Sequence, residues 1–111
     1  MTRRHETPPV DPRSSARRFE PLPRRTVAGR EVPVAVGLRA RLLGLALLDR
    51  EAAGPGLLIP RCASVHTFGM RFALDLYFLG RGDEILDLRR AVPPRRFVAH
   101  RGAVAVLELP P

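Results

Sequence analysis

Short apolar runs separated by glycine and proline dominate the chain from about residue 26 onward. Such runs include Leu57-Leu58-Ile59, Leu74 to Leu79 and Ala103 to Leu109, and turn-forming residues bound each of them. Short apolar runs between turn signals are typical of buried strands. The pattern predicts a mainly β fold, either a compact β-sandwich or a small barrel, with about six strands and one packed α-helix.

The turn residues also predict how neighbouring strands are joined. Gly80-Arg81-Gly82-Asp83 separates Leu74 to Leu79 from Glu84 to Leu88, which is typical of a hairpin. A first strand pair is expected around Ala28-Gly29-Arg30, and two final strands around Arg101-Gly102.

One segment has helical periodicity. From Gly37 to Arg50, leucines recur at helical spacing, at Leu38, Leu42, Leu45 and Leu48. Gly44 lies inside this segment and costs about 1 kcal/mol relative to alanine. Either the helix packs closely against a neighbouring backbone at Gly44, or it ends early.

Polar side chains interrupt the most apolar stretch of the chain, VHTFGMRFALDLYFL from Val65 to Leu79. In an extended chain, alternate residues share a face. His66 would then lie on an apolar face, and Thr67, Arg71 and Asp75 on the opposite, polar face. Because Gly69 offers a natural bend, we expect two segments here, with the alternation changing near that glycine.

The formal net charge is +8, and all 19 basic residues are arginine. A complete absence of lysine is more typical of compositional bias than of a surface selected for phosphate contacts. Residues 1–25 are rich in proline and arginine and predict a disordered N-terminal tail, ahead of a single β-rich domain at 26–111. Nucleic-acid binding through this tail is one hypothesis, which the sequence does not favour.

Cys62 is the only cysteine, so no intramolecular disulfide can form and a reducing, cytoplasmic compartment is expected. The N-terminus lacks the apolar segment of a signal peptide. The leucine-rich segment from Leu38 to Leu48 contains arginines and is too short to cross a membrane. We therefore expect no membrane association.

Several motifs together resemble the small bacterial and archaeal proteins grouped as domain of unknown function 192. They are RARLLGL at Arg39 to Leu45, GLLI at Gly56 to Ile59, CASVHTFGMRFALDLYFL at Cys62 to Leu79, and LEL at Leu107 to Leu109. The resemblance covers about Ala35 to Leu109 and implies a compact β-rich domain with no established activity. Relatives often have Pro-Trp-Arg near Pro94-Arg95-Arg96, where this chain lacks the tryptophan. Some exported relatives have Trp-Met-Lys-Asn-Thr in place of the His-Thr version found here.

The candidate ligand-binding residues come from the VHTFGMRF motif and the strand that follows it. They are His66, Thr67, Met70, Arg71 and Asp75. Arginines near such a cleft favour a small anionic ligand, and a protein partner is the other possibility. Asp75 lies between leucines and needs a partner, which Arg71, Arg41, Arg95 or Arg96 could supply. A buried Asp75 pair with a purely structural role is the favoured reading of that residue.

A hydrolase-like or metal-assisted enzyme is the alternative, with His66 acting together with Asp75 or Cys62. The histidine, cysteine and carboxylate spacings match no recognised metal site, so we expect neither a metal nor another cofactor. The structural interpretation of His66 is a buried imidazole that hydrogen bonds to backbone. No phosphate loop or serine-hydrolase elbow is present, so the sequence supports no familiar enzyme class.

Overall fold

Eight strands in three antiparallel sheets form the described part of the chain, so the predicted mainly β class is confirmed. The computed structural model describes residues 18–111, with the side chains of Leu38 and Arg39 excepted. The described sheets form no closed barrel. The elements, in chain order, are β1 (Arg24–Val27), β2 (Arg30–Pro33), α2 (Leu38–Leu43), η1 (Arg50–Ala53), β3 (Leu57–Pro60), β4 (Ser64–His66), β5 (Leu74–Leu79), η2 (Arg81–Asp83), β6 (Ile85–Val92), β7 (Phe97–Ala99) and β8 (Ala105–Leu109).

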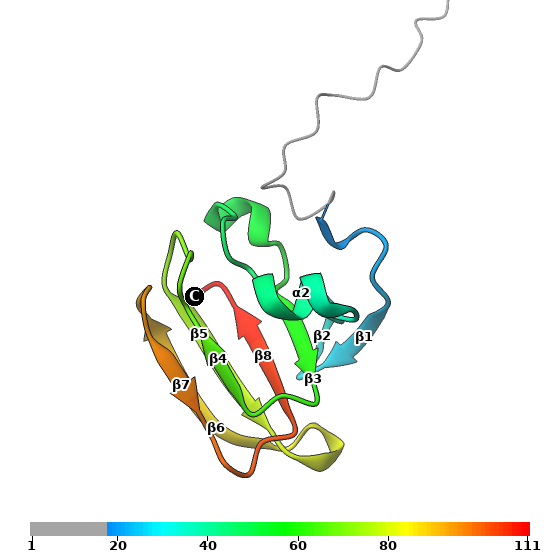
Figure 1. Cartoon of the computed structure of the whole chain (residues 1–111). Helices are drawn as coiled ribbons and strands as arrows, with labels where there is room; N and C mark the ends of the chain where they lie inside the picture. The colour runs from blue at the N-terminus through cyan, green and yellow to red at the C-terminus, as the bar shows by residue number, and fades with distance from the viewer. Residues whose placement is uncertain (1–17) are drawn as a thin grey trace, which may run out of the picture.

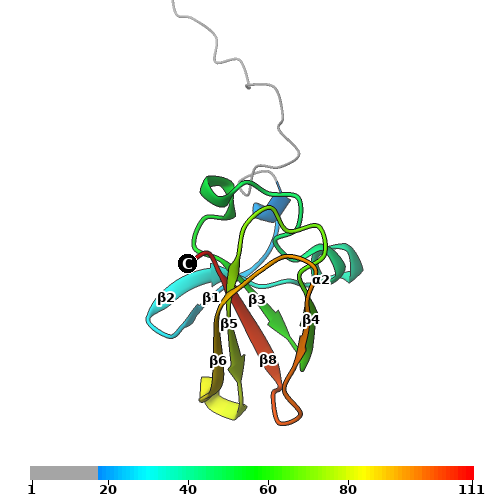
Figure 2. The same ribbon diagram turned by 90° about the vertical axis from the view of Figure 1, so that its left-hand side faces the viewer.

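A four-stranded sheet in the order β3-β8-β5-β6 forms the middle layer of the domain. The β1–β2 hairpin lies on one side of it, and α2 and the β4–β7 pair lie on the other (Figures 1 and 2). The last strand, β8, is central because it pairs with both β3 and β5. Side chains of β8 therefore point alternately into the two buried layers.

Each face of the central sheet buries its own apolar cluster. On the face toward α2 and β4, the larger cluster contains Leu57, Leu76 and Phe78. On the opposite face, Leu58, Leu79 and Leu107 pack with Val27 and Val32 of the β1–β2 hairpin. Burial of apolar side chains on both faces explains why these strands have nearly continuous apolar sequences.

The predicted first strand pair is confirmed. β1 and β2 pair around Ala28 and Gly29, both of which have positive φ angles, 50° and 79°. Two consecutive positive φ angles are typical of tight hairpin turns. The hairpin continues toward the central sheet through a bridge between Val34 and Leu58.

The predicted helix from Gly37 to Arg50 is wrong in its length. α2 ends at Leu43, and Gly44 follows with φ 52° and ψ −129°, which only glycine adopts readily. The early end, one of the two interpretations of Gly44, is therefore confirmed. Leu45 and Leu48 are fully buried from the turns that follow the helix, whereas Leu42 is 60% exposed.

The segment from Val65 to Leu79 is divided into two strands, as expected. β4 ends at His66 and β5 begins at Leu74, with Gly69 at φ 82° in the connecting loop. The alternation changes in this loop, because His66 is exposed and Thr67 is buried. The predicted hairpin after β5 is also confirmed, and β6 extends to Val92.

The two predicted final strands exist, but they belong to different sheets. β7 pairs with β4, and β8 joins the central sheet. Residues 100–103 connect the two sheets through a turn in which the Ala103 N–H donates to His100 O at 3.1 Å. This connection places β4 and β7 over one face of the central sheet.

The folded region begins earlier than Thr26. Phe19 is 3% exposed and belongs to the larger apolar cluster, and β1 begins at Arg24. The predicted tail therefore does not extend to residue 25, and its residues 1–17 lie outside the described residues. Within the described range, no helix has the length and apolar character needed to cross a membrane.

Candidate functional site

A buried glutamate lies on the face of the central sheet that α2 and β4 cover. Glu108 on β8 is opposite Leu57 of β3 and Leu76 of β5, so its side chain shares their face. Only 3% of Glu108 is exposed. A buried carboxylate among apolar side chains needs hydrogen bonds or a charged partner, because burial removes its solvation.

The two carboxylate oxygens of Glu108 differ in their surroundings. Oε1 accepts a hydrogen bond of 3.3 Å from the Leu45 N–H, just after α2. Oε2 accepts none from the described residues, yet every fully buried side-chain oxygen or nitrogen among them has a hydrogen-bond partner. Glu108 also lines a cavity on this face of the central sheet.

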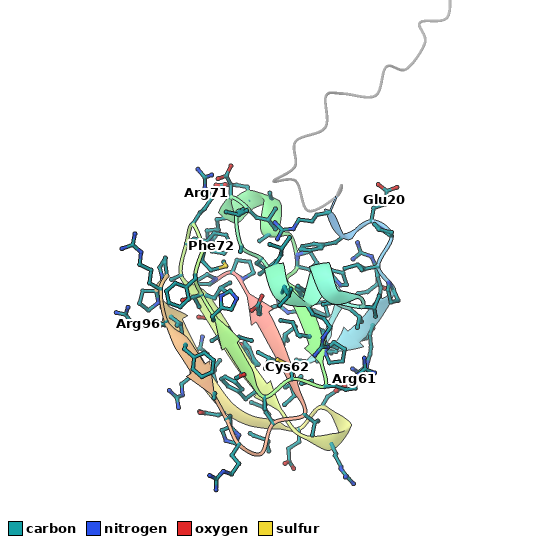
Figure 3. The ribbon with its side chains drawn as sticks, viewed as in Figure 1. Glu20, Arg61, Cys62, Arg71, Phe72 and Arg96 are labelled. Atoms are coloured by element: carbon teal, nitrogen blue, oxygen red, sulfur yellow. The ribbon has the colours of Figure 1, made fainter. Side chains whose placement is uncertain are left out.

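This space, the Glu108 cavity, lies between α2, β3, β4 and β8. Its volume is about 160 Å³. Its lining residues are Arg41, Leu42, Leu43, Gly44, Ile59, Cys62, Ser64, Val65, His66 and Glu108. The lining thus combines an acid, a histidine, a hydroxyl, a thiol and an arginine with apolar side chains. Cys62 follows β3 on this side of the molecule (Figure 3).

Burial of Glu108 raises the pKa of its carboxyl group from 4.5 to about 7. The hydrogen bond from Leu45 and the positive charge of Arg18 oppose this rise, but desolvation is the largest effect. At neutral pH the carboxyl group is therefore divided between its neutral and charged forms. A residue with such a pKa in a cavity is a functional candidate on physical grounds.

The other polar groups of the cavity come from β4, the loop before it, and α2. His66 is exposed, and its ring centroid lies 5.9 Å from that of Phe68, so the interpretation of a buried imidazole is wrong. The Cys62 thiol donates to Ser64 O at 2.9 Å. Arg41 donates to the carbonyl oxygens of Pro60 and Arg61, which holds its guanidinium against the end of β3.

Thr67 follows His66, which lines the cavity, but Thr67 itself has a structural role. It is fully buried, and its hydroxyl group donates to Pro93 O at 2.7 Å and accepts from the Arg96 N–H at 2.8 Å. These bonds join the loop between β6 and β7 to the end of β4. With both functions of its hydroxyl group used, Thr67 has a structural role in this arrangement.

Met70 and Arg71 lie apart from the cavity lining. Met70 is 8% exposed and belongs to the larger apolar cluster. Arg71 is exposed, and its Nε atom lies 3.1 Å from Asp49 Oδ1. Figure 3 shows Arg71 at the end of the domain remote from Cys62.

Asp75 forms a hydrogen bond to the backbone at an irregularity in the pairing of β5 with β6. The register shifts between Leu74 and Leu76, and Ala91 on the partner strand has φ 50°. Asp75 Oδ1 accepts a 2.8 Å hydrogen bond from the Ala91 N–H. Its ionic partner is Arg90, at 3.6 Å, and none of the four arginines that the sequence suggested. The carboxylate thus accepts a hydrogen bond from a backbone N–H at a β-bulge.

The structure therefore brings only His66, of the five sequence-predicted residues, to the cavity. It places Thr67 in a loop junction, Met70 in the core, Arg71 on the surface, and Asp75 at a bulge on the opposite face of the central sheet. The five predicted residues therefore do not converge on one cleft. His66 and Cys62 line the same cavity, whereas His66 and Asp75 do not.

Glu108 is the site residue that the sequence reasoning missed. It follows the apolar run Ala103 to Leu107, and β8 is central and buried, so a charge at this position is as unusual as the one at Asp75. The place of a glutamate in an apolar run could therefore have identified Glu108 from the sequence. What the sequence does not provide is the proximity of Gly44 and Leu45, which comes from tertiary packing.

One solved structure has a similar fold, and a second protein is similar in sequence over part of the chain. A crystal structure of a protein of unknown function from Novosphingobium aromaticivorans DSM 12444 matches with a TM-score of 0.57 and 19% sequence identity, covering 78% of this chain and 70% of that one. At this identity the match shows the fold alone. A UPF0127 protein from Thermococcus sibiricus is 42% identical over 48 residues, which are 43% of this chain and 31% of that protein.

The family assignment depends on a match over most of the domain. The family model DUF192, described as an uncharacterised ACR, matches residues 23–111, from just before β1 to the last residue of the chain. This range contains the whole Glu108 cavity. The resemblance inferred from the motifs is confirmed: the chain belongs to the DUF192 family, whose function is uncharacterised.

Proposed function

We propose that the domain binds a small anionic group, such as a carboxylate or a phosphate, in the Glu108 cavity. The observation that carries the proposal is the buried carboxyl group of Glu108, which has one hydrogen bond, from the Leu45 N–H, and belongs to a residue that lines a cavity together with Arg41, His66 and apolar side chains. In its neutral form Glu108 donates a hydrogen bond through Oε2, and an anion is the strongest acceptor for it.

The charges around the cavity favour an anion over a cation. Arg41 lines the cavity, and Arg18 is close enough to Glu108 to affect the pKa of its carboxyl group. With Glu108 neutral, the guanidinium group of Arg41 remains as a charged group in the lining. The whole chain adds a net charge of +8, which attracts anions at long range.

The proposal predicts that anion binding and proton uptake by Glu108 are linked. An anion is repelled by the charged form of Glu108 and held by the neutral form, so binding weakens as pH rises through the pKa of Glu108. Since that pKa is about 7, the neutral fraction falls roughly tenfold between pH 6 and pH 8. The affinity of the cavity for an anion should fall by a similar factor.

Amide NMR titration of the full chain with sodium acetate and sodium phosphate, at constant ionic strength, tests this proposal. We expect shifts at Gly44, Leu45, Ser64 and His66, and an affinity about tenfold lower at pH 8 than at pH 6. Glu108→Gln imitates the neutral acid, so it should keep the affinity and lose most of the pH dependence. Glu84→Gln, at an exposed position, makes the same charge change and should behave as wild type.

Other outcomes of this titration contradict the proposal. Shifts spread over the arginine-rich surface without the cavity amides would indicate nonspecific anion binding. Loss of acetate and phosphate binding in Glu108→Gln would show that a neutral hydrogen-bond donor at this position does not hold the anion. A pH dependence that survives unchanged in Glu108→Gln would show that Glu108 is not the group responsible for it.

Acid–base catalysis is the second candidate function, and a specific observation favours it. Glu108 has a pKa close to neutral and shares its cavity with His66 and Cys62. General acids and bases are most effective when their pKa is close to the working pH. Hydrolysis of p-nitrophenyl acetate and p-nitrophenyl phosphate, with Glu108→Gln and His66→Ala as comparisons, tests this candidate. Turnover that both variants retain would exclude a role for this cavity.

A cytoplasmic location remains part of the proposal. It is supported by the single free cysteine, since a thiol persists in a reducing compartment. Fractionation of cells expressing the full-length protein from its own gene measures it directly, and recovery outside the cytoplasm would overturn it.

A further inference from the structure

The strand that lines the Glu108 cavity has an unpaired edge. In β4, the backbone groups that pair with β7 belong to alternate residues: the Thr67 N–H donates to Arg96 O at 2.8 Å, and the His100 N–H donates to Ala63 O at 2.9 Å. In an antiparallel ladder the intervening residues direct their N–H and C=O groups to the opposite edge. Ser64 and His66 are those residues in β4.

These outward groups are available for hydrogen bonding. The register of β4 and β7 places Ser64 opposite Ala99 and His66 opposite Phe97 as the pairs that do not exchange ladder hydrogen bonds, and the Cys62 thiol donates to the Ser64 carbonyl. Both residues line the Glu108 cavity. A short strand edge with free backbone groups is a template for an added strand.

Large apolar side chains are exposed around the same opening. Leu42, which lines the cavity, is 60% exposed, and Phe68, whose ring contacts that of His66, is 54% exposed. Phe97 is directly opposite His66 on β7 and is 70% exposed. Exposed aromatic and aliphatic side chains close together are typical of interaction sites.

The size of the cavity limits what enters it. Its volume of about 160 Å³ is well below the roughly 300 Å³ at which pockets for drug-sized ligands begin. A larger ligand must therefore place a small terminal group inside and lie across the rim. An extended peptide does so with its terminal carboxylate, and it also supplies the backbone groups and side chains that the β4 edge and the rim can contact.

We infer that the anion bound in the Glu108 cavity is the C-terminal carboxylate of an extended peptide that adds to the free edge of β4, an inference that rests on the proposed function. The last residue enters the cavity beside Glu108 and Arg41. The residues before it pair with Ser64 and His66, and their apolar side chains contact Leu42 and Phe68. The partner is therefore a protein with an accessible, apolar C-terminal segment.

Two peptide arrays test this inference on the full chain. Both contain hexapeptides attached through their N-termini and randomised at the last three positions; one array ends in a free carboxylate and the other in a carboxamide. We expect a subset of the free acids to bind, with at least tenfold less binding to their amide twins. For a selected binder, N-methylation should abolish binding at alternate peptide bonds, because only alternate N–H groups face β4.

A rim variant provides an independent readout. Phe68→Ser should weaken binding of the selected peptide at least fivefold. Ile85→Ser changes a side chain with 51% exposure on β6, away from the cavity, and should leave peptide binding unchanged. Equal effects of the two substitutions would overturn the inference.

The array results also separate this inference from the proposed function. Equal binding to acids and amides, or tolerance of N-methylation at every position, overturns the inference. So does an absence of peptide binding while acetate still shifts the cavity amides, and that result leaves the proposed function intact. If neither acetate nor any free-acid peptide reaches the cavity, both are wrong.

Discussion

The absence of a side chain at Gly44 makes room for the carboxylate of Glu108. A Cβ atom at Gly44 would lie 2.7 Å from Glu108 Oε1, closer than such contacts occur in proteins. Gly44 ends α2, and the next residue, Leu45, donates its N–H to the same oxygen. The end of the helix and the position of the buried acid therefore depend on one another.

Gly44→Ala should destabilise the domain by about 2 to 4 kcal/mol, through backbone strain and displacement of the Glu108 carboxylate. Gly37→Ala is the matched control, because Gly37 is at the other end of α2 with φ 85° and has no atom within 4 Å of an added Cβ. It should cost about 1 to 3 kcal/mol from backbone strain alone. Urea unfolding measures both, and equal losses would contradict the close contact.

Glu108→Gln should change how stability depends on pH. Below about pH 4.5 the carboxyl is protonated in both the folded and unfolded states, and its stabilising contribution is fully present. As pH rises toward the folded-state pKa of about 7, only the unfolded state releases the proton, so the contribution is lost. The free energy of unfolding of wild type, relative to Glu108→Gln, should fall by on the order of 3 kcal/mol between pH 4.5 and pH 8.

Urea unfolding of the two proteins across this pH range measures the effect. Glu84→Gln serves as the control, because Glu84 is exposed and its removal should give a nearly constant difference from wild type. A constant difference between wild type and Glu108→Gln would show that the carboxyl titrates normally and that burial does not hold its proton.

Asp75→Ala should cost about 1 to 3 kcal/mol, because it leaves the Ala91 N–H without an acceptor at the bulge. Asp75→Asn should cost less, since an amide oxygen can accept the same bond. Arg90→Ala should cost no more than about 0.5 kcal/mol, because the Arg90 side chain is 70% exposed and the ion pair is long. If Asp75→Asn lowers the free energy of unfolding as much as Asp75→Ala does, the negative charge of Asp75 stabilises β5 and β6, and its hydrogen bond from the Ala91 N–H does not.

Thr67→Val should destabilise the junction between β4 and the loop before β7. The substitution keeps the volume but removes a hydroxyl group that both donates and accepts, at a cost of about 1 to 3 kcal/mol. Amide exchange at Arg96, whose N–H bonds to that hydroxyl, should accelerate. Thr26→Val, at an exposed position of β1, should change stability by less than about 0.5 kcal/mol, and a similar loss there would argue against a special role for Thr67.

Local sequence signals were sufficient for most of the strands. Turn residues at Ala28-Gly29 and Gly80 to Asp83 delimit hairpins because they act on the neighbouring backbone. The leucine spacing after Gly37 predicted a helix that is too long, because Leu45 and Leu48 are buried against the central sheet without being part of a helix. Periodicity cannot distinguish these two causes of burial.

The site was less predictable than the fold. His66 was identified from its unusual place in an apolar run, but the same criterion also selected Asp75, which pairs with a bulge. A sequence does not show which face of a sheet a buried charge will occupy, or whether a cavity lies beside it. Gly44 and Leu45, which are distant from Glu108 in sequence, lie at its carboxylate, and His66 lines the same cavity, and the sequence shows neither relationship.

The proposed function requires that the Glu108 cavity binds an anion when Glu108 is neutral. Carbon-13 NMR of the glutamate side-chain carboxyl groups, recorded against pH with and without saturating sodium acetate, tests it most directly. We expect a Glu108 pKa of about 7 in the free protein and a clear upward shift of that pKa with acetate, because the anion binds the neutral form. An unchanged or lowered pKa in the presence of acetate would contradict it.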